Sequence, residues 1–295
     1  MRRTPLCALV ALMLCLPATA MAGPTPQPVI DDFSRIVRFG EAIDISGHVD
    51  NGSPGQVVEL ERRRPETEDW VAIDQRVLDK SLQAGFVLDD ARRTSFYRMK
   101  VDETVSEEIR IRVRAKLTLS VGTKDLMERD ATVLSGFLRP AADGRSVLLE
   151  QRVAGSWEPI GRALVDDGHY ALPARFSRNG YRPVRATFQR DALNDGTRVQ
   201  RTLRVHRPSL ATWYGPGFFG NRTACGQRYT RHSVGIAHRK LPCGTNVHVL
   251  FGRETISLDV IDRGPYTDAN WDLSQKAARR IGFYGKEDIG ILIRR

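Results

Sequence analysis

The sequence predicts an all-β protein: two tandem β-sandwiches, then a smaller C-terminal domain of short strands with one short helix. Three observations lead to this fold class. Short alternating apolar runs, such as Val57–Leu60 and Ile109–Val113, are divided by Gly, Pro, Asn and Asp, a spacing typical of strands. The pattern repeats after roughly 85–90 residues, about the size of one β-sandwich. From about Val205 onward the repeat stops and the composition changes.

Residues 1–22 have the features of an export signal. Arg2 and Arg3 supply positive charge, Leu6–Leu16 is an uninterrupted apolar stretch, and Ala20–Ala22 is a small-x-small cleavage site. The apolar stretch is shorter than the roughly 18–20 residues of a membrane span, which disfavours the alternative of a retained signal anchor. No later segment is apolar enough to cross a bilayer. We therefore predict an exported protein, either periplasmic or extracellular and associated with the cell wall.

Two repeats follow a short proline-rich linker at residues 23–28. We assign residues 29–115 to the first sandwich and residues 116–205 to the second. The matching segments are Ile45–Val49 with Leu134–Leu138, Gly55–Leu60 with Gly144–Leu149, Trp70 with Trp157, Gly85–Phe86 with Gly168–Tyr170, and Tyr97–Arg98 with Tyr181–Arg182. Two such units in tandem resemble bacterial immunoglobulin-like modules. The tryptophans are predicted to lie in the sandwich cores, with exposed sugar platforms as the alternative. Neither repeat gathers catalytic groups, which favours a spacer or adhesion role.

The positive charge is concentrated in the C-terminal region. The chain has 45 Lys and Arg against 35 Asp and Glu, a net charge of +10. Residues 207–295 alone hold 14 basic and 7 acidic residues, a balance of +7. A basic domain outside the cytoplasm meets anionic wall polymers before it meets nucleic acid, and the chain has no nucleic-acid-binding motif. The predicted partner is wall polysaccharide, although the charge alone also fits an ordinary solvated surface.

Only two cysteines, Cys225 and Cys243, remain once the export signal is removed. A single pair in an oxidising compartment predicts a disulfide. This bond would close a loop of about 18 residues and stabilise the domain by roughly 3 kcal/mol. A zinc site that includes His232, His238 or His248 is the alternative, disfavoured because neither cysteine belongs to a C-x-x-C pair. No metal ion or organic cofactor is predicted.

Five motifs follow one another within residues 206–295. They are Trp213-Tyr214-Gly215, Thr223-Ala224-Cys225-Gly226, Ala237-His238 with Leu241-Pro242-Cys243-Gly244-Thr245, Asp262-Arg263-Gly264-Pro265-Tyr266, and Asp272-Leu273-Ser274. From roughly Leu210 to the C-terminus, this ordered set resembles the rare lipoprotein A family, whose double-psi β-barrel is shared with expansins. The resemblance implies a six-stranded double-psi β-barrel here. A short helix is expected next, with Asp272 and Ser274 as capping residues and Gly282 as its stop.

The family's enzymes are lytic transglycosylases, which cleave the glycan strands of peptidoglycan and prefer strands stripped of stem peptides. The resemblance implies that Asp262 is the catalytic acid and base, supported by His238 and Asp272. One carboxyl group suffices because the 6-hydroxyl of muramic acid itself attacks and gives a 1,6-anhydro end, whereas an ordinary glycosidase needs a second carboxylate. Asp262 must then hold a proton near neutral pH, which requires desolvation or a nearby carboxylate such as Asp272. The alternative is that Asp262 only caps the turn made by Gly264 and Pro265.

Further residues are expected to contact the sugar. They are Thr212, Tyr214, Thr223, Gln227, Arg263, Tyr266 and Trp271. The threonine hydroxyls suit sugar hydroxyls, and the aromatic rings suit stacking on sugar rings, with packing as the alternative. His238 is expected to bond the catalytic carboxylate or a sugar hydroxyl, with a satisfied core histidine as the alternative. The chain departs from the family at Gln227 and Thr230, where the transglycosylases commonly carry carboxylates. Gln227 can form hydrogen bonds with a sugar, but it cannot exchange a proton.

Together these features predict an exported lytic transglycosylase that acts on peptidoglycan. A non-catalytic, expansin-like protein that binds and loosens wall polysaccharide is one alternative, and Gln227 favours it. An adhesion or scaffold protein, in which the barrel is only a cap, is another. The presence of both Asp262 and Asp272 favours the enzyme over the scaffold. The sequence leaves open what the sandwiches bind and the oligomeric state.

Overall fold

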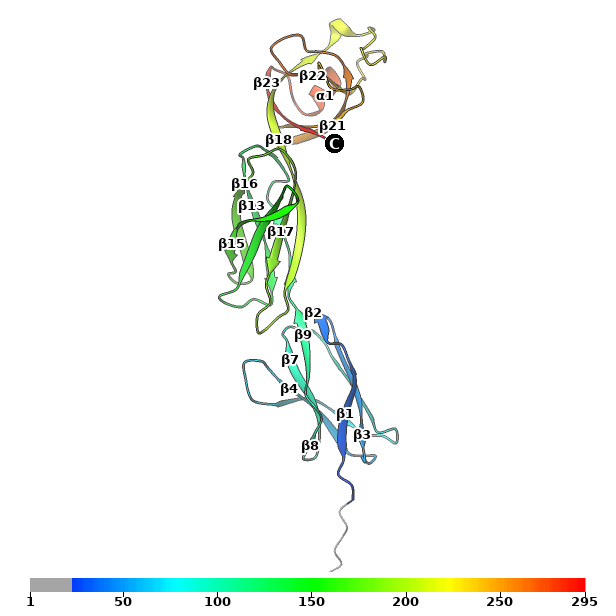
Figure 1. Cartoon of the computed structure of the whole chain (residues 1–295). Coiled ribbons are helices and arrows are strands. Elements are labelled where there is room, and N and C mark those ends of the chain that lie inside the picture. The colour runs from blue at the N-terminus through cyan, green and yellow to red at the C-terminus, as the bar shows by residue number, and fades with distance from the viewer. Residues whose placement is uncertain (1–22, 295) are drawn as a thin grey trace, which may run out of the picture.

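The structure is a computed structural model that describes residues 23–294, so the predicted export signal lies outside the described residues. Nearly all regular elements are strands, with one α-helix, α1 (Gln275–Arg280), and one 3-10 turn, η1 (Pro216–Phe218). Figure 1 shows three bodies in a row, from the blue and cyan N-terminal sandwich to the yellow, orange and red barrel. The predicted all-β fold class is confirmed. Neither helical segment of this described part is long and apolar enough to cross a membrane.

The first sandwich packs two sheets face to face. Its strands are β1 (Gln27–Phe33), β2 (Ile36–Arg38), β3 (Ile43–Asp50), β4 (Val57–Arg63), β5 (Val71–Val77), β6 (Gln83–Leu88), β7 (Ser95–Val101), β8 (Thr104–Val105) and β9 (Ile109–Arg114). One sheet has the order β1-β3-β6, and the other has the order β2-β9-β7-β4-β5 with β8 beside β7. In β3 every second residue from Ile43 onward is buried, the alternation of a strand with one face in a core. Gln27 and Pro28, assigned above to the linker, pair with the end of β3.

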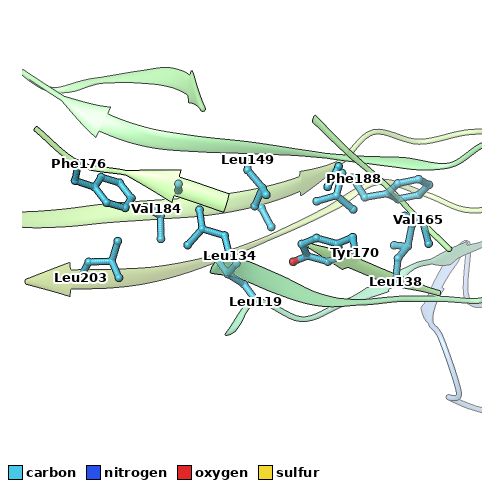
Figure 2. Packing of buried hydrophobic residues seen from close by; sticks show 14 of the residues in the cluster. Leu119, Leu134, Leu138, Leu149, Val165, Tyr170, Phe176, Val184, Phe188 and Leu203 are labelled. Carbon is cyan, nitrogen blue, oxygen red and sulfur yellow. The ribbon is translucent and has the colours of Figure 1, made fainter. Parts of the chain in front are cut away.

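The second sandwich repeats this architecture. Its strands are β10 (Lys116–Leu117), β11 (Ser120–Val121), β12 (Asp125–Met127), β13 (Ala131–Arg139), β14 (Ser146–Val153), β15 (Ser156–Leu164), β16 (His169–Arg175), β17 (Gly180–Phe188) and β18 (Thr197–Tyr214). β13 pairs with β10, β11 and β16, while β15-β14-β17-β18 form the facing sheet with β12 beside β18. Figure 2 shows the core between the sheets, where Leu134 and Leu138 of β13 face Leu149, Val184 and Leu203.

The two sandwiches share local details as well as strand order. β3 and β13 each carry a glycine, Gly47 and Gly136, where any Cβ would collide with a backbone carbonyl of the neighbouring segment. Both β4–β5 and β14–β15 hairpins also contain a register shift at the same place, directly before Glu61 in the first and Glu150 in the second. These shared irregularities are what a true internal repeat predicts.

Trp70 and Trp157 are not core residues, so that prediction is wrong. Both side chains are half-buried. In each sandwich an arginine guanidinium lies over the indole ring, 4.2 Å and 4.3 Å from the centroid respectively. A buried glutamate holds each arginine at 2.6 Å. The two stacks consist of Trp70, Arg98 and Glu61 in the first sandwich and of Trp157, Arg185 and Glu150 in the second.

The C-terminal domain is a closed barrel of six strands, as predicted. It comprises the last part of β18, β19 (Ile236–Ala237), β20 (Asn246–Phe251), β21 (Glu254–Asp262), β22 (Trp271–Ser274) and β23 (Glu287–Ile293). The order is β18-β22-β19-β21-β20-β23, and pairing between β18 and β23 closes the barrel. α1 begins after Ser274, whose side chain caps it, and Gly282 follows its last turn with a φ of +69°.

One strand joins the second sandwich to the barrel. The first half of β18 pairs with β17 of the sandwich, and its second half, from Arg207, pairs with β23 and β22 of the barrel. The predicted junction at residues 205 and 206 lies inside this strand. A shared strand leaves no free linker between the two bodies, so the barrel has a defined position relative to the sandwich.

Candidate active site

Four residues form one row across the barrel wall. Thr212 of β18 pairs with Asp272 of β22, Asp272 pairs with Ala237 of β19, and Ala237 pairs with Asp262 of β21. Residues in register on neighbouring strands project to the same face. The two carboxyl groups therefore flank the small side chain of Ala237. Two strand spacings of about 4.8 Å put the Cα atoms of the two acids roughly 10 Å apart.

A register shift in β21 turns Asp262 toward this row. β19 pairs Ile236 with Val260 and the next residue, Ala237, with Asp262, so Ile261 is an extra residue on β21. Ile236 and Val260 are both buried in the barrel core. In a regular strand Asp262 would project to the same side as Val260, into that core. The extra residue directs Asp262 to the opposite face, which is a common use of bulges beside active sites.

Gly235 makes room for this bulge. A Cβ at Gly235 would lie 2.6 Å from three side-chain atoms of Ile261, closer than real Cβ atoms approach other atoms. The N–H group of Gly235 donates to the Ser274 hydroxyl at 3.1 Å, which holds the segment against β22. The absence of a side chain at Gly235 is therefore part of what positions Asp262.

The Asp262 carboxyl group is half-buried, and the backbone fixes one of its oxygens. Oδ1 accepts hydrogen bonds from the N–H groups of Ala224 and Arg263, both at 2.8 Å. Oδ2 accepts none from the residues that the structure describes. The bond from the Arg263 N–H group is a local turn contact, as expected if Asp262 only caps the turn made by Gly264 and Pro265. The bond from Ala224 comes from a distant loop and sets the orientation of the carboxyl group, leaving Oδ2 free for a ligand.

The carboxyl group of Asp272 has a raised pKa. Burial raises the pKa of its carboxyl group to about 6; a hydrogen bond from the Thr212 hydroxyl at 2.9 Å opposes this rise, and the charge of Asp262 adds to it. The expectation that Asp262 holds a proton near neutral pH stays a prediction. The buried environment of Asp272 favours a bound proton.

Tyr214 is buried over the row, so the prediction that its ring stacks on a sugar is wrong. Its side chain is only 7% exposed, and its ring stacks on Tyr229 with the centroids 4.5 Å apart. Burial raises the pKa of Tyr214, and the charges of Tyr229, Asp262 and Asp272 raise it further. Its hydroxyl group has no hydrogen-bond partner among the described residues, so it bonds neither acid of the row.

Three buried polar atoms around the row have no hydrogen-bond partner among the described residues. They are the Tyr214 hydroxyl, Thr223 Oγ1 and Arg263 Nη1. Thr223 and Arg263 lie beside the residues that fix Asp262, since Thr223 precedes Ala224 and Arg263 follows Asp262. An unpaired buried polar group costs roughly 1–3 kcal/mol.

His238 forms no hydrogen bond with either carboxylate of the row in the described structure, so the predicted bond to the catalytic acid is wrong. Its Nδ1 accepts the N–H groups of Lys240 and Leu241, at 3.1 Å and 3.0 Å. The neutral ring therefore carries its proton on Nε2. Burial lowers the pKa of His238, and nearby positive charges, first that of Arg239, lower it further. The ring packs against Trp271 with the centroids 4.4 Å apart.

The other predicted contact residues differ in exposure. Tyr266 is 86% exposed, so its ring is free to stack on a sugar. Trp271 is 5% exposed, and its indole N–H donates to the Ser209 hydroxyl at 3.1 Å, so only its edge can reach a ligand. Gln227 is exposed, and within residues 23–294 its side chain has no hydrogen-bond partner.

Cys225 and Cys243 form the predicted disulfide, with their Cα atoms 5.7 Å apart. Because Cys225 follows Ala224, the bond anchors the loop that donates to Asp262. The alternative zinc site loses its thiolate ligands to this bond. Across residues 23–294, no three His, Cys, Asp or Glu side chains gather in a way that could hold a metal ion.

Two central residues, Ala237 and Tyr229, were not predicted from the sequence. Ala237 separates the two acids, and Tyr229 covers Tyr214 and donates to its backbone carbonyl at 2.7 Å. Ala237 belongs to the third motif, but the motif gave it no role of its own. No motif includes Tyr229.

Residues 209–293 match a family model described as "Lytic transglycolase". The probable endolytic peptidoglycan transglycosylase RlpA of Synechocystis is 43% identical over 86 residues, which cover 28% of this chain and 27% of that protein. The endolytic peptidoglycan transglycosylase RlpA of Campylobacter jejuni is 39% identical over 75 residues, covering 24% and 27%. The chain therefore spans about a quarter of the length of these relatives. The predicted rare lipoprotein A-like double-psi β-barrel is confirmed for the C-terminal region.

Among solved structures, an I-band fragment of titin is similar over 86% of this chain and 97% of the fragment. The TM-score is 0.30 and the sequence identity is 11%. A likeness at this level adds nothing to the sandwich architecture described above.

Proposed function

We propose that this protein is an exported lytic transglycosylase that cleaves peptidoglycan glycan strands and leaves 1,6-anhydro ends. The similarity of residues 209–293 to proteins named for this activity supports the proposal. The observation that carries it is the row in which Asp262 and Asp272 flank Ala237, one acid oriented by backbone bonds and the other with its pKa raised to about 6. The excess positive charge of the barrel suits a polymer that bears carboxylates.

In this proposal Asp262 is the residue that contacts the scissile bond. Its carboxyl group gives a proton to the departing oxygen while the 6-hydroxyl of muramic acid attacks C1. The bond between C1 and the departing oxygen breaks, and the bond between C1 and O6 forms. Asp262 then takes the proton of the attacking hydroxyl, so the carboxyl group is restored and no water is consumed.

Asp272 is the second acid of the proposal and stores a proton. Asp272 holds a proton in weakly acidic solution because its pKa is raised to about 6. The buried Tyr214 hydroxyl forms no hydrogen bond with either acid among the described residues, so it is assigned no proton transfer. His238, neutral and bonded to the backbone, shapes the neighbouring wall rather than transferring protons.

Release of anhydro-muropeptides tests the proposal. Amidase-stripped sacculi are incubated with the wild-type protein and with three variants, and the soluble products are analysed by mass spectrometry. We expect anhydro ends from the wild type and a loss of at least about 100-fold in Asp262→Asn. Asp272→Asn should also lose activity, and the exposed control Asp268→Asn should match the wild type. A wild type without anhydro products, or an active Asp262→Asn, rejects the proposal.

A non-catalytic, expansin-like wall-binding function is the second candidate. Gln227 favours it, because it is exposed where the resembling transglycosylases carry a carboxylate. In that case the protein sediments with sacculi, releases no product, and binds equally well as Asp262→Asn. A protein that does not sediment with sacculi at all would favour an adhesion or scaffold role.

A further inference from the structure

A groove of about 750 Å³ lies where the second sandwich meets the barrel. The sandwich contributes the start of β17, with Asn179 and Tyr181, and the barrel contributes His238, Asn270 and Trp271. This volume is within the range of about 300–1,000 Å³ that is typical of small-molecule sites. Neither Asp262 nor Asp272 lines the groove, so it is distinct from the row.

The groove is nevertheless next to the row along the chain. Trp271 directly precedes Asp272, and His238 directly follows Ala237. Successive residues of a strand project to opposite faces. β22 therefore presents Asp272 on one face and Trp271, part of the groove wall, on the other, and His238 of the groove wall directly follows the end of β19. A polymer that crosses this edge can contact both places.

The walls of the groove are held in fixed positions. β18 runs unbroken through both bodies. Arg204 of β18 forms a two-pronged ion pair with Asp125, both contacts at 2.6 Å. The Tyr181 ring meets His248 of the barrel edge-on, with the centroids 6.3 Å apart. Because the walls are already fixed, little conformational entropy of the protein is lost when a ligand binds.

The chemistry of the lining suits a sugar chain. Tyr181 is 43% exposed and offers a ring for stacking on the apolar face of a pyranose. Asn179 and Asn270 offer amide groups, and neutral His238 offers its Nε2 proton. Arg207, with a side chain 66% exposed and its nearest acid 3.8 Å away, suits the lactyl carboxylate of a muramic acid without its stem peptide.

We propose that this groove is a remote subsite that holds the glycan strand several sugars away from the bond that is cut, and that the second sandwich is therefore part of the substrate-binding surface. The inference rests on the proposed function for the identity of the polymer. It assigns the sandwich a role beyond that of a spacer. It also predicts that the protein prefers long strands over short ones.

Binding is measured in the Asp262→Asn background, so that no strand is cut during the experiment. The probes are peptide-free glycan strands of two sugars and of eight or more. We expect the long strand to bind about tenfold tighter than the short one, and Tyr181→Ala to abolish that preference while short-strand binding stays unchanged. Tyr181→Phe, which keeps the ring, should retain the preference.

Phe137→Ala is the matched control, because Phe137 is also 43% exposed on the second sandwich but lies outside the groove. If Tyr181→Ala melts at a lower temperature than its parent, Asn179→Ala provides the same test without loss of a ring. The inference is overturned if the Tyr181→Ala and Asn179→Ala variants keep the preference for long strands. It is also overturned if Phe137→Ala loses as much of that preference as Tyr181→Ala, or if no strand binds.

Failure of the inference can be distinguished from failure of the proposed function. If the Asp262-containing protein releases anhydro ends but Tyr181→Ala leaves KM for long strands unchanged, the subsite is wrong and the activity stands. If no anhydro ends form but the length preference depends on Tyr181, the subsite stands and the activity is wrong.

Discussion

At the residue scale, the two acids of the row differ in what surrounds them. Asp262 has one oxygen held between two backbone N–H groups and the other free. Asp272 is also half-buried, and its one side-chain hydrogen bond comes from the Thr212 hydroxyl. Pairs of acids whose environments separate their proton affinities are a common basis for acid–base chemistry. Because of this contrast, we assign contact with the scissile glycosidic bond to Asp262 and storage of a proton to Asp272.

The raised pKa of Asp272 predicts a pH dependence of stability. Because the folded-state pKa of about 6 lies above the ordinary 3.8, the folded protein binds this proton more tightly than the unfolded chain. The stabilisation is fully present below about pH 4 and is lost as the pH rises through 6. In urea titrations, the free energy of unfolding of the wild type relative to Asp272→Asn should fall by roughly 2 kcal/mol between pH 4 and pH 7. The same comparison with the exposed control Asp288→Asn should give a difference that does not change between pH 4 and pH 7. If the difference between the wild type and Asp272→Asn is also independent of pH, the raised pKa of Asp272 is contradicted.

The ordered motifs predicted the identity of both acids, because they lie in segments that resemble a known family. The sequence could not predict the raised pKa of Asp272, since its burial depends on the pairing of β22 with β18 and β19, which are distant in sequence. The predicted bond between His238 and the catalytic carboxylate failed for a local reason. Its Nδ1 is occupied by the backbone of the next turn, a contact that no motif reveals.

At the element scale, the bulge at Ile261 predicts a strong effect of a small substitution. Gly235→Ala places a Cβ against the Ile261 side chain and should displace the bulge and Asp262 with it. We expect the rate of anhydro product release to fall by about 100-fold, the cost of a misplacement of about 1 Å. Product release is measured by mass spectrometry, with circular dichroism to confirm folding.

The double variant Gly235→Ala, Ile261→Ala provides the control for this prediction. Removing the Ile261 side chain relieves the collision, so the double variant should be more active than Gly235→Ala alone. Ile261→Ala by itself reports the cost of the lost packing. Equal activity of Gly235→Ala and the wild type would show that the bulge does not position Asp262 for the reaction.

The stacks of Trp, Arg and Glu in the sandwiches predict a modest cost for loss of the indole. Because Trp157 is half-buried under Arg185 rather than in the core, Trp157→Ala should cost about 1 kcal/mol in chemical denaturation. Phe176→Ala, a core substitution in the same sandwich, should cost about 3–5 kcal/mol. If the two variants lose equal free energy of unfolding, Trp157 contributes as much as a core residue and this interpretation is wrong.

At the scale of the whole molecule, the junction between the sandwiches is a hydrogen-bonded loop. Buried Asn194 donates to the carbonyls of Arg92 and Val113, at 3.0 Å and 3.2 Å, and accepts from Arg145 at 2.8 Å. Asn194→Ala removes these bonds and leaves buried groups unpaired, at roughly 1–3 kcal/mol each. Small-angle scattering should show a broader distribution of interdomain distances. The exposed barrel variant Asn221→Ala should scatter like the wild type, and an unchanged Asn194→Ala profile would contradict a rigid junction.

The repeat and the change of composition near Val205 predicted three bodies in this order. They did not predict that β18 serves two sheets. Its partners, β17 on one side and β22 and β23 on the other, are distant in sequence, and their pairing cannot be deduced from alternation within a single strand. The register of the row could not be predicted for the same reason, because it depends on pairing among four separate segments.

Digestion of peptide-free glycan strands in 18O-labelled water tests the central claim most directly. If Asp262 moves protons for an internal attack by the 6-hydroxyl, the new ends are 1,6-anhydro, contain no label and vanish in Asp262→Asn. Labelled reducing ends would mean that water attacks, and unlabelled anhydro ends undiminished in Asp262→Asn would mean that another group does the chemistry. Either result would contradict the assignment of Asp262.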